Sequence, residues 1–424
     1  MIVNMGKTNK ALLLILVFFI NQTVICMQDT CDKGEQKSKR YLLYDVNPGE
    51  GFNLRRDVYI RIANLVRKLN DADNWVLILP PWGNLYHWQR VQRGVYVPWK
   101  NFFDIESLSK WIPVAEFSDY LKDEGPRVGS VYVLQHYAEG WEGKWEEKYD
   151  KRKCIDKHNF EYRGGDDGSW VGQVWGTKIQ TENFTCLSIQ GQASTLVPLV
   201  TQDLKRRSVF IVRAETILHD EYGGKWYWNA RRSMRFAHHL REEAASFRRK
   251  YLNSEDVQDK TVVKEDWRDT QPKRGVAVGG PYIAAHLRRR DFIHARGDEV
   301  PSLKKAAQQI KELLKKENLT TVFIATDASL EEFQELESFL PGYKVVRYEP
   351  SPDFFHKWGD GGVAVVDQII SSHARYFTGS YESTFSFRIQ EEREILGFQE
   401  RTTFNRLCGK KKSCEQPAKW RITY

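Results

Sequence analysis

The sequence predicts an α/β fold in which two Rossmann-like domains face a central cleft. Strands alternate with helices at the start of the chain, and the same alternation returns from residue 282. A polar, charged stretch at residues 253–271 indicates a linker, and 424 residues exceed the length over which a single core keeps growing. We therefore expect an N-terminal domain at residues 38–250 and a C-terminal domain at residues 272–424.

The first half opens with a strand, a turn, a helix and a second strand. Residues 41–46 form an apolar strand, apolar side chains at helical spacing follow at residues 58–69, and residues 75–79 form the next strand. Residues 144–185 are rich in Trp, Gly and charge without a clear period, so long loops pinned by two cysteines are expected there. The helical pattern returns at residues 229–251.

The second half alternates throughout, which predicts an open, mostly parallel sheet whose ligands bind at the carboxyl ends of its strands. Strands are expected at residues 282–287, 322–325, 343–348 and 376–378, and helices at residues 303–314, 330–340, 363–374 and from 384. Polar segments that follow these strands are therefore candidates for a site.

The N-terminus predicts secretion. Lys7 and Lys10 precede an apolar run at residues 11–20, which is too short to span a bilayer comfortably and indicates a signal peptide at residues 1–26. Later segments lack about 18 consecutive uncharged apolar residues. We expect the mature protein to be soluble in the lumen of the secretory pathway, with no membrane span.

Six cysteines fit that oxidising compartment. Their spacing favours a short ring between Cys408 and Cys414 and a longer one between Cys154 and Cys186, while Cys26 and Cys31 straddle the region of signal cleavage. Two sequons, at Asn183 and Asn318, are candidate glycosylation sites in a luminal chain.

Composition limits the partners. The chain carries 64 basic and 56 acidic residues, and the net charge of +8 favours acidic ligands. The basic residues are scattered in pairs with no stripe, so nucleic acid is not expected. No metal is expected either, because the sequence has no CxxC pair or His cluster, and Asp71-Ala72-Asp73 lies in a turn after a helix, away from the expected cleft.

Three polar segments fall at strand ends or helix starts, where an open sheet places its ligands. They are residues 49–53, 286–291 and 383–385. In the first, Glu50 stands between two glycines, and the helix start beyond it offers amide donors to a phosphate or sugar. A solvated loop glutamate that complements the helix dipole is the alternative.

In the second segment, His286 and Arg288 share one side of the chain as its strand ends. Arg288 could grip a diphosphate bidentately and supply the positive charge that a departing nucleotide diphosphate requires. The alternative is a basic loop that pairs with Asp291 and Asp298.

The third segment, with Ser383 and Thr384, begins a helix whose free amides suit a phosphate, although ordinary capping explains it equally well. On the same helix Arg388 and Glu392 are four residues apart and could pair. Asp367 lies in an apolar helical pattern, where a carboxylate needs a partner, either the N1 and N2 donors of guanine or an arginine of the protein.

These segments resemble the protein O-fucosyltransferase family, closest to its member that modifies thrombospondin type 1 repeats, over nearly the whole mature chain. The most specific motifs are Asn47-Pro-Gly-Glu-Gly-Phe-Asn-Leu-Arg-Arg-Asp-Val-Tyr, His286-Leu-Arg-Arg-Arg-Asp-Phe, Asp367-Gln, Ser383-Thr-Phe-Ser-Phe-Arg, Glu391-Glu-Arg-Glu and the C-terminal Cys414-Glu-Gln-Pro-Ala-Lys-Trp-Arg-Ile-Thr-Tyr. The resemblance implies a GT-B fold and an inverting, metal-independent transfer of fucose from GDP-fucose to a Ser or Thr hydroxyl of a folded domain. It also implies the lumen of the endoplasmic reticulum.

The resemblance assigns roles to single residues. Glu50 is implied as the base that accepts the proton of the acceptor hydroxyl, Arg288 as the group that stabilises the departing β-phosphate, and Glu392 as required for activity. The positions implied to bind the donor are Gly49, Glu50, Gly51, Phe52, Asn53, His286, Leu287, Arg288, Asp367, Ser383, Thr384 and Phe385. The chain departs from the family at Gly49, where relatives often carry a second proline.

Two alternatives stay open. A fucosyltransferase that acts on glycans or on epidermal-growth-factor-like domains would share the Arg288 loop but need a different acceptor cleft. A non-catalytic binder or chaperone of cysteine-rich domains would share the fold, but an intact Glu50 and Arg288 argue against it. The C-terminal Arg-Ile-Thr-Tyr is not a KDEL-type retention signal.

Overall fold

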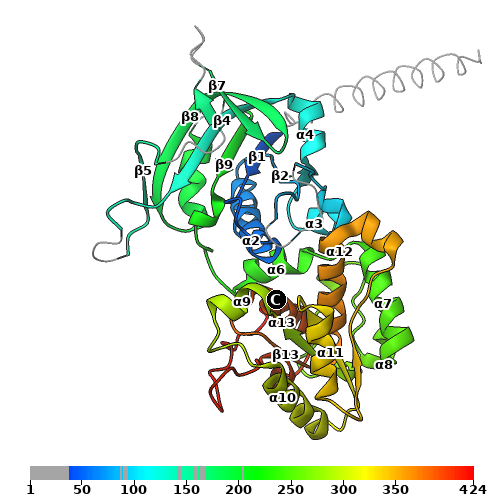
Figure 1. The fold of residues 1–424 in the computed structure, drawn as a ribbon. Coiled ribbons are helices and arrows are strands. Elements are labelled where there is room, and N and C mark those ends of the chain that lie inside the picture. The colour runs from blue at the N-terminus through cyan, green and yellow to red at the C-terminus, as the bar shows by residue number, and fades with distance from the viewer. Residues whose placement is uncertain are drawn as a thin grey trace, which may run out of the picture. The chain divides into compact units, whose positions relative to one another are not determined.

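The first half of the chain builds a nine-stranded sheet in this computed structural model (Figure 1). The strands are β1 (Arg40–Tyr44), β2 (Trp75–Leu79), β3 (Val114–Glu116), β4 (Arg127–Gln135), β5 (Lys148–Lys151), β6 (Phe160–Tyr162), β7 (Trp170–Val174), β8 (Thr177–Gln190) and β9 (Ser208–Val212). Their order is β3-β2-β1-β9-β4-β8-β7-β6, with β5 paired to β8. The pairs from β3 to β8 are parallel, whereas β5, β6 and β7 pair antiparallel.

The structure describes residues 38–85, 88, 94–140, 145–155, 160–162, 169–202 and 205–424. The predicted signal peptide at residues 1–26, and with it Cys26 and the nearby Cys31, lies outside the described residues.

Helices connect and follow the strands of the first half. Strands β1, β2 and β9 are buried along their whole length, as expected of parallel strands covered on both faces. The helices are α2 (Phe52–Leu69), α3 (Ile105–Ser109), α4 (Phe117–Glu124), α5 (Val197–Thr201), α6 (Lys225–Ser233), α7 (His238–Leu252) and α8 (Asp256–Asp259), with short 3-10 helices at Trp99–Asn101, Ala193–Leu196, Ala214–Thr216 and Trp267–Asp269. Residues 229–251, expected as one helix, belong to α6 and α7 because Phe236 leaves the helix and stacks on Phe103.

The second half builds a four-stranded sheet in which every pair is parallel, in the order β12-β11-β10-β13. Its strands are β10 (Gly280–Leu287), β11 (Thr321–Thr326), β12 (Lys344–Val346) and β13 (Ala374–Gly379), and its helices are α9 (Arg290–Ala295), α10 (Leu303–Lys316), α11 (Leu330–Ser338), α12 (Pro352–Ser372), α13 (Thr384–Leu396) and α14 (Glu400–Thr403). Leu287 pairs with Thr326 and His286 with Gly379, so the carboxyl ends of three neighbouring strands lie together.

Helices from the two halves pack on each other. Helix α7 lies alongside α12 (Figure 1), and α13 contacts α2. One hydrophobic cluster runs through both halves and includes Leu65 from the first and Ile389 from the second. Residues 40–424 form one compact unit, and the two predicted domain boundaries within it stay predictions.

Residues 144–185 are not the long loops that their composition predicted. Their described parts include β5, β6, β7 and most of β8; β8 pairs parallel with β4, and β5, β6 and β7 extend the first sheet antiparallel. Trp170 and Phe184 stack across two of these strands with ring centroids 4.5 Å apart. Burial alternates along the start of β8 and becomes continuous near its end, so no single period marks this strand in the sequence.

The predicted linker at residues 253–271 is packed against the rest of the chain. Arg248, buried near the end of α7, pairs with Asp256 at 2.7 Å and Asp259 at 3.3 Å, and Trp267 is buried. The polar composition was misleading because two of its carboxylates, Asp256 and Asp259, pair with a buried arginine of α7.

Both predicted disulfides are present. Cys154 is bonded to Cys186 on β8, and Cys408 is bonded to Cys414 in the C-terminal segment. Every described helix is too short or too polar to cross a bilayer.

The two sequons differ in accessibility. Asn318 is exposed just after α10, whereas Asn183 lies half-buried on β8 and donates from Nδ2 to Ser130 Oγ at 3.3 Å. Glycosylation of either residue stays a prediction.

Candidate active site

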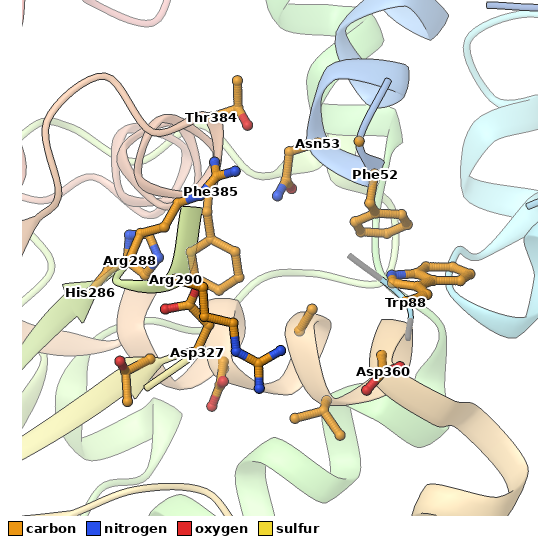
Figure 2. A pocket seen from close by; sticks show the side chains of 15 residues that line it. Phe52, Asn53, Trp88, His286, Arg288, Arg290, Asp327, Asp360, Thr384 and Phe385 are labelled. Atoms are coloured by element: carbon orange, nitrogen blue, oxygen red, sulfur yellow. The ribbon is translucent and has the colours of Figure 1, made fainter. Parts of the chain in front are cut away.

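A pocket of about 280 Å³ opens where the carboxyl ends of β10 and β11 meet the first turns of α2 and α13 and one face of α12. Figure 2 shows Phe52 and Trp88 on one side of this pocket and His286, Arg288 and Phe385 on the other. Its walls are Gly51, Phe52, Asn53, Trp88, His286, Arg288, Arg290, Thr326, Asp327, Asp360, Val363, Ala364, Asp367, Thr384 and Phe385. Both halves of the chain build it, at the strand ends where a ligand is expected.

The three segments that the sequence singled out come together here. The predicted positions that line the pocket are Gly51, Phe52, Asn53, His286, Arg288, Asp367, Thr384 and Phe385. Gly49 and Glu50 precede Gly51 on the same loop, and Ser383 is buried as the N-cap of α13. The side chain of Leu287 packs in the core of the second sheet, and Glu392 lies two turns along α13 from Thr384.

Arg290 lies in the predicted segment at residues 286–291 but had no role assigned, and six wall residues lie outside all predicted positions: Trp88, Thr326, Asp327, Asp360, Val363 and Ala364. Those from α12 precede Asp367 by seven, four and three positions, so helical spacing from Asp367 was a usable signal for them. Thr326 ends β11, the strand next to β10, and Asp327 follows it. Trp88 comes from a loop without any periodic pattern and carries no sequence signal.

His286, near the end of β10, is uncharged at neutral pH. Its ring stacks on Phe385 with centroids 4.4 Å apart, and its Nδ1 lies 2.8 Å from Ser386 Oγ. Burial lowers the pKa of His286 to about 3, and the nearby Arg288 charge adds to the shift. A neutral imidazole shapes this wall and offers hydrogen bonds without adding charge.

Arg288 is held in place by a carboxylate. Its Nε donates to one oxygen of Asp291 at 3.0 Å and its Nη2 to the other, and its guanidinium lies 4.1 Å from the centroid of Phe292. The pairing with Asp291 that the sequence offered as an alternative therefore occurs, yet Arg288 also lines the pocket. The five N–H donors of a guanidinium can serve a carboxylate on one edge and a bound anion on another.

The N-terminus of α13 faces the cavity, since its first residue, Thr384, lines the wall. The N-cap residue Ser383 gives the helix no side-chain cap, and its hydroxyl has no hydrogen-bond partner among the described residues. The uncapped amides of the first turn and the helix dipole together favour an anion such as a phosphate.

Asp367 brings a carboxylate into the wall formed by α12. Burial raises its pKa well above the ordinary value, and the charge of Arg347 only opposes this shift, while Arg347 itself pairs with Glu349 at 3.3 Å. The direct arginine partner that the sequence offered for Asp367 is therefore not seen among the described residues. A ligand with N–H donors would offset the cost of burying this group.

The loop that carries Glu50 is pinned from two sides. Arg55 Nε donates to the backbone oxygen of Glu50 at 3.0 Å, and the Asn47 N–H donates to Glu215 Oε2 at 3.1 Å. Burial raises the pKa of Glu50, the Glu215 charge adds to the shift, and Arg55 and Arg61 oppose it. A half-buried carboxylate with a raised pKa, next to the first turn of α2, is suited to accept a proton.

Glu392 belongs to a buried ion network. It accepts from Arg231 Nη2 at 2.9 Å, and Arg231 Nε donates to Glu391 at 2.6 Å. Arg388 pairs with Glu391 at 3.0 Å and with Asp57 at 3.4 Å, so the Arg388–Glu392 pair suggested by their spacing does not form. The network ties α13 to α6 and α2, which gives Glu392 a physical role as a brace for the helix that faces the pocket.

Comparison with known proteins identifies the family. The sequence profile described as GDP-fucose protein O-fucosyltransferase matches residues 41–396. The chain is 52% identical over 403 residues to GDP-fucose protein O-fucosyltransferase 2 of Homo sapiens, covering 92% of this chain and 91% of that protein. The protein of the same name in Caenorhabditis elegans is 47% identical over 392 residues, covering 91% of each.

Solved structures share the fold. The crystal structure of POFUT1 in complex with GDP-fucose matches with a TM-score of 0.56 at 15% identity, covering 87% of this chain and 97% of that chain. This likeness, together with the two mainly parallel sheets, confirms the predicted GT-B-like α/β architecture. By sequence, the chain belongs to the GDP-fucose protein O-fucosyltransferase family, which confirms the family and the enzyme class that its motifs predicted.

Proposed function

We propose that this chain transfers fucose from GDP-fucose, with inversion and without a metal ion, to a Ser or Thr hydroxyl of a folded thrombospondin type 1 repeat. The make-up of one pocket carries the proposal: a helix N-terminus and an arginine, a half-buried carboxylate in the wall, and a glutamate on the adjoining loop. Membership of the family supports the donor. The resemblance of the motifs to the member that modifies thrombospondin type 1 repeats supports the acceptor class.

The pocket suits a guanosine diphosphate. The Asp367 carboxylate accepts from the N1 and N2 donors of guanine, which offsets the cost of its burial. The diphosphate lies against the N-terminus of α13 and the Arg288 guanidinium. These two features supply the positive potential that a divalent cation supplies in other nucleotide sites. The described residues contain no cluster of three or more His, Cys, Asp or Glu side chains that could hold a metal ion.

Glu50 acts as the general base in this proposal. The acceptor oxygen attacks the anomeric carbon of fucose from the face opposite the diphosphate, and Glu50 takes the hydroxyl proton. The bond between the anomeric carbon and the β-phosphate oxygen breaks, and GDP leaves with the electron pair. Arg288 stabilises the charge that develops on the β-phosphate.

The acceptor class is tested by incubating the purified protein with GDP-fucose, with and without EDTA, and with a thrombospondin type 1 repeat or an epidermal-growth-factor-like domain, each folded or reduced. We expect fucose on the folded thrombospondin repeat alone, unaffected by EDTA. Transfer only to the growth-factor-like domain would overturn the acceptor assignment. Absence of both transfer and GDP release would favour the non-catalytic binder.

The proposed location is the lumen of the endoplasmic reticulum, which the two disulfides support. Digestion of the cell-expressed protein with endoglycosidase H tests it, because luminal glycans at Asn318 or Asn183 would be removed. A chain without such glycans, found outside the secretory pathway, would contradict this location.

A further inference from the structure

Arg56 is a fully buried cation in the second turn of α2. Its guanidinium carbon lies over the rings of Phe236, Phe103 and Phe52, at 4.9, 5.5 and 5.7 Å from their centroids. Its Nε and Nη2 atoms have no hydrogen-bond partner within the described residues. Burying such a charge is costly, and an apolar residue would fill the same space, so a role beyond packing is expected.

The remaining terminal nitrogen of Arg56, Nη1, donates hydrogen bonds to two side-chain amides. Arg56 Nη1 donates to Gln368 Oε1 at 2.7 Å and to Asn53 Oδ1 at 3.2 Å. Gln368, which is buried on α12, in turn donates from Nε2 to the same Asn53 oxygen at 2.8 Å. The three side chains form a closed ring of hydrogen bonds that joins α2 to α12.

This ring determines which way the Asn53 amide faces. Arginine has N–H donors and no acceptor, so both amides must turn their oxygens toward it. The Asn53 oxygen therefore accepts from Arg56 and Gln368, and its NH2 group is left to serve the pocket that Asn53 lines. Figure 2 shows Asn53 extending from α2 at the same end of the pocket as Thr384. Two N–H donors thus stand beside the helix N-terminus that favours a phosphate.

We propose that Arg56 and Gln368 are positioning residues that hold the Asn53 amide with its NH2 group toward the diphosphate of the donor. The inference rests on the proposed function, which places GDP-fucose in this pocket. Neither Arg56 nor Gln368 lines the pocket, so each acts through Asn53. The charges of Glu391 and Glu392 favour the Arg56 cation, and the diphosphate adds negative charge on the far side of the polarised Asn53 amide.

A double-mutant cycle tests this by calorimetry of GDP binding to Arg56→Met, Asn53→Ala and the double variant. Methionine suits a site between three aromatic rings. Each single change should weaken GDP binding about tenfold, the usual effect of losing a hydrogen bond to a charged group. Because Arg56 acts through Asn53, the double variant should bind GDP less than about twofold more weakly than Asn53→Ala does. Guanosine, which has no phosphates, should bind all variants equally.

Several outcomes would overturn the positioning role. The first is unchanged GDP affinity in Arg56→Met. The second is an equal loss of GDP affinity on adding Arg56→Met to the unaltered protein and to Asn53→Ala. The third is a loss of guanosine affinity that parallels the loss of GDP affinity. If Arg56→Met does not fold, Gln368→Met replaces it in the same cycle with the same criteria. Absence of GDP binding by the unaltered protein would instead overturn the proposed function.

Arg67→Met is the matched control. Arg67 lies on the same helix, about 16 Å further along, has an Nε without a partner among the described residues, and stacks 4.2 Å from the centroid of Trp226. It should leave GDP affinity unchanged. A loss as large as that of Arg56→Met would show that any change to α2 disturbs the pocket, which would also count against the positioning role.

Discussion

Removing Glu391 should destabilise the protein much more than removing its neighbour Glu392. Glu391 is fully buried and shared by Arg231 at 2.6 Å, Arg388 at 3.0 Å and the hydroxyl of Tyr227. Its loss leaves buried charges uncompensated, which costs about 3–5 kcal/mol. The Glu392 side chain is 24% exposed, and Arg231 keeps Glu391 when Glu392 is lost, so we expect only about 1–2 kcal/mol for Glu392→Ala.

Urea unfolding of Glu391→Ala, Glu392→Ala and Arg231→Met/Glu392→Ala measures this order. The double variant should be less stable than Glu392→Ala alone, because methionine also removes the 2.6 Å partner of the buried Glu391. Transfer by Glu392→Ala should fall in step with its stability and return at lower temperature. If Glu392→Ala abolishes transfer while its unfolding free energy and GDP affinity stay unchanged, Glu392 acts in the chemistry and the brace role is refuted.

Three further predictions concern the pocket. Glu50 must be ionised to act as a base, so the rate should fall as pH drops through its pKa, which burial and the Glu215 charge both raise. Glu215→Gln keeps an oxygen for the Asn47 N–H but removes the charge, so the acidic limb of kcat/KM against pH should move to lower pH; an unmoved limb would contradict this. Asp367→Ala should weaken GDP binding by about 10–100-fold and reduce the preference for GDP over ADP in competition calorimetry, and unchanged selectivity would exclude a guanine contact. Arg288→Ala should weaken both GDP binding and turnover, whereas unaltered GDP affinity would remove its role at the phosphate.

The fold was predictable wherever the burial of an element keeps one pattern along its whole length. The strand expected at residues 75–79 is observed as Trp75–Leu79, and the helix expected at residues 303–314 as Leu303–Lys316. Helix α12 begins eleven residues earlier than expected, because Gly359, at a φ of 55°, kinks it and the apolar period starts only beyond the kink. Hydrophobic periodicity does not predict a strand whose burial pattern changes along its length, as in β8.

The site was predictable in part for a related reason. Its three segments follow strands or begin helices, and those positions can be recognised locally. The contacts that hold them cannot, because Arg56 meets Gln368 across 312 positions and Arg231 meets Glu392 across 161. The sequence therefore indicated that Glu392 is required only through the family resemblance, and the structure supplied its partner, Arg231.

The central claim, that Glu50 is the base of an inverting transfer from GDP-fucose to a folded thrombospondin type 1 repeat, is tested most directly by Glu50→Ala. GDP-fucose affinity is measured by calorimetry, fucose on the repeat by mass spectrometry, and the anomeric configuration of the unaltered protein's product by NMR. The account predicts near-normal donor binding, transfer reduced by about 100-fold or more, and a product configuration opposite to that of the donor. Near-normal transfer by Glu50→Ala, or retention of configuration, would contradict it.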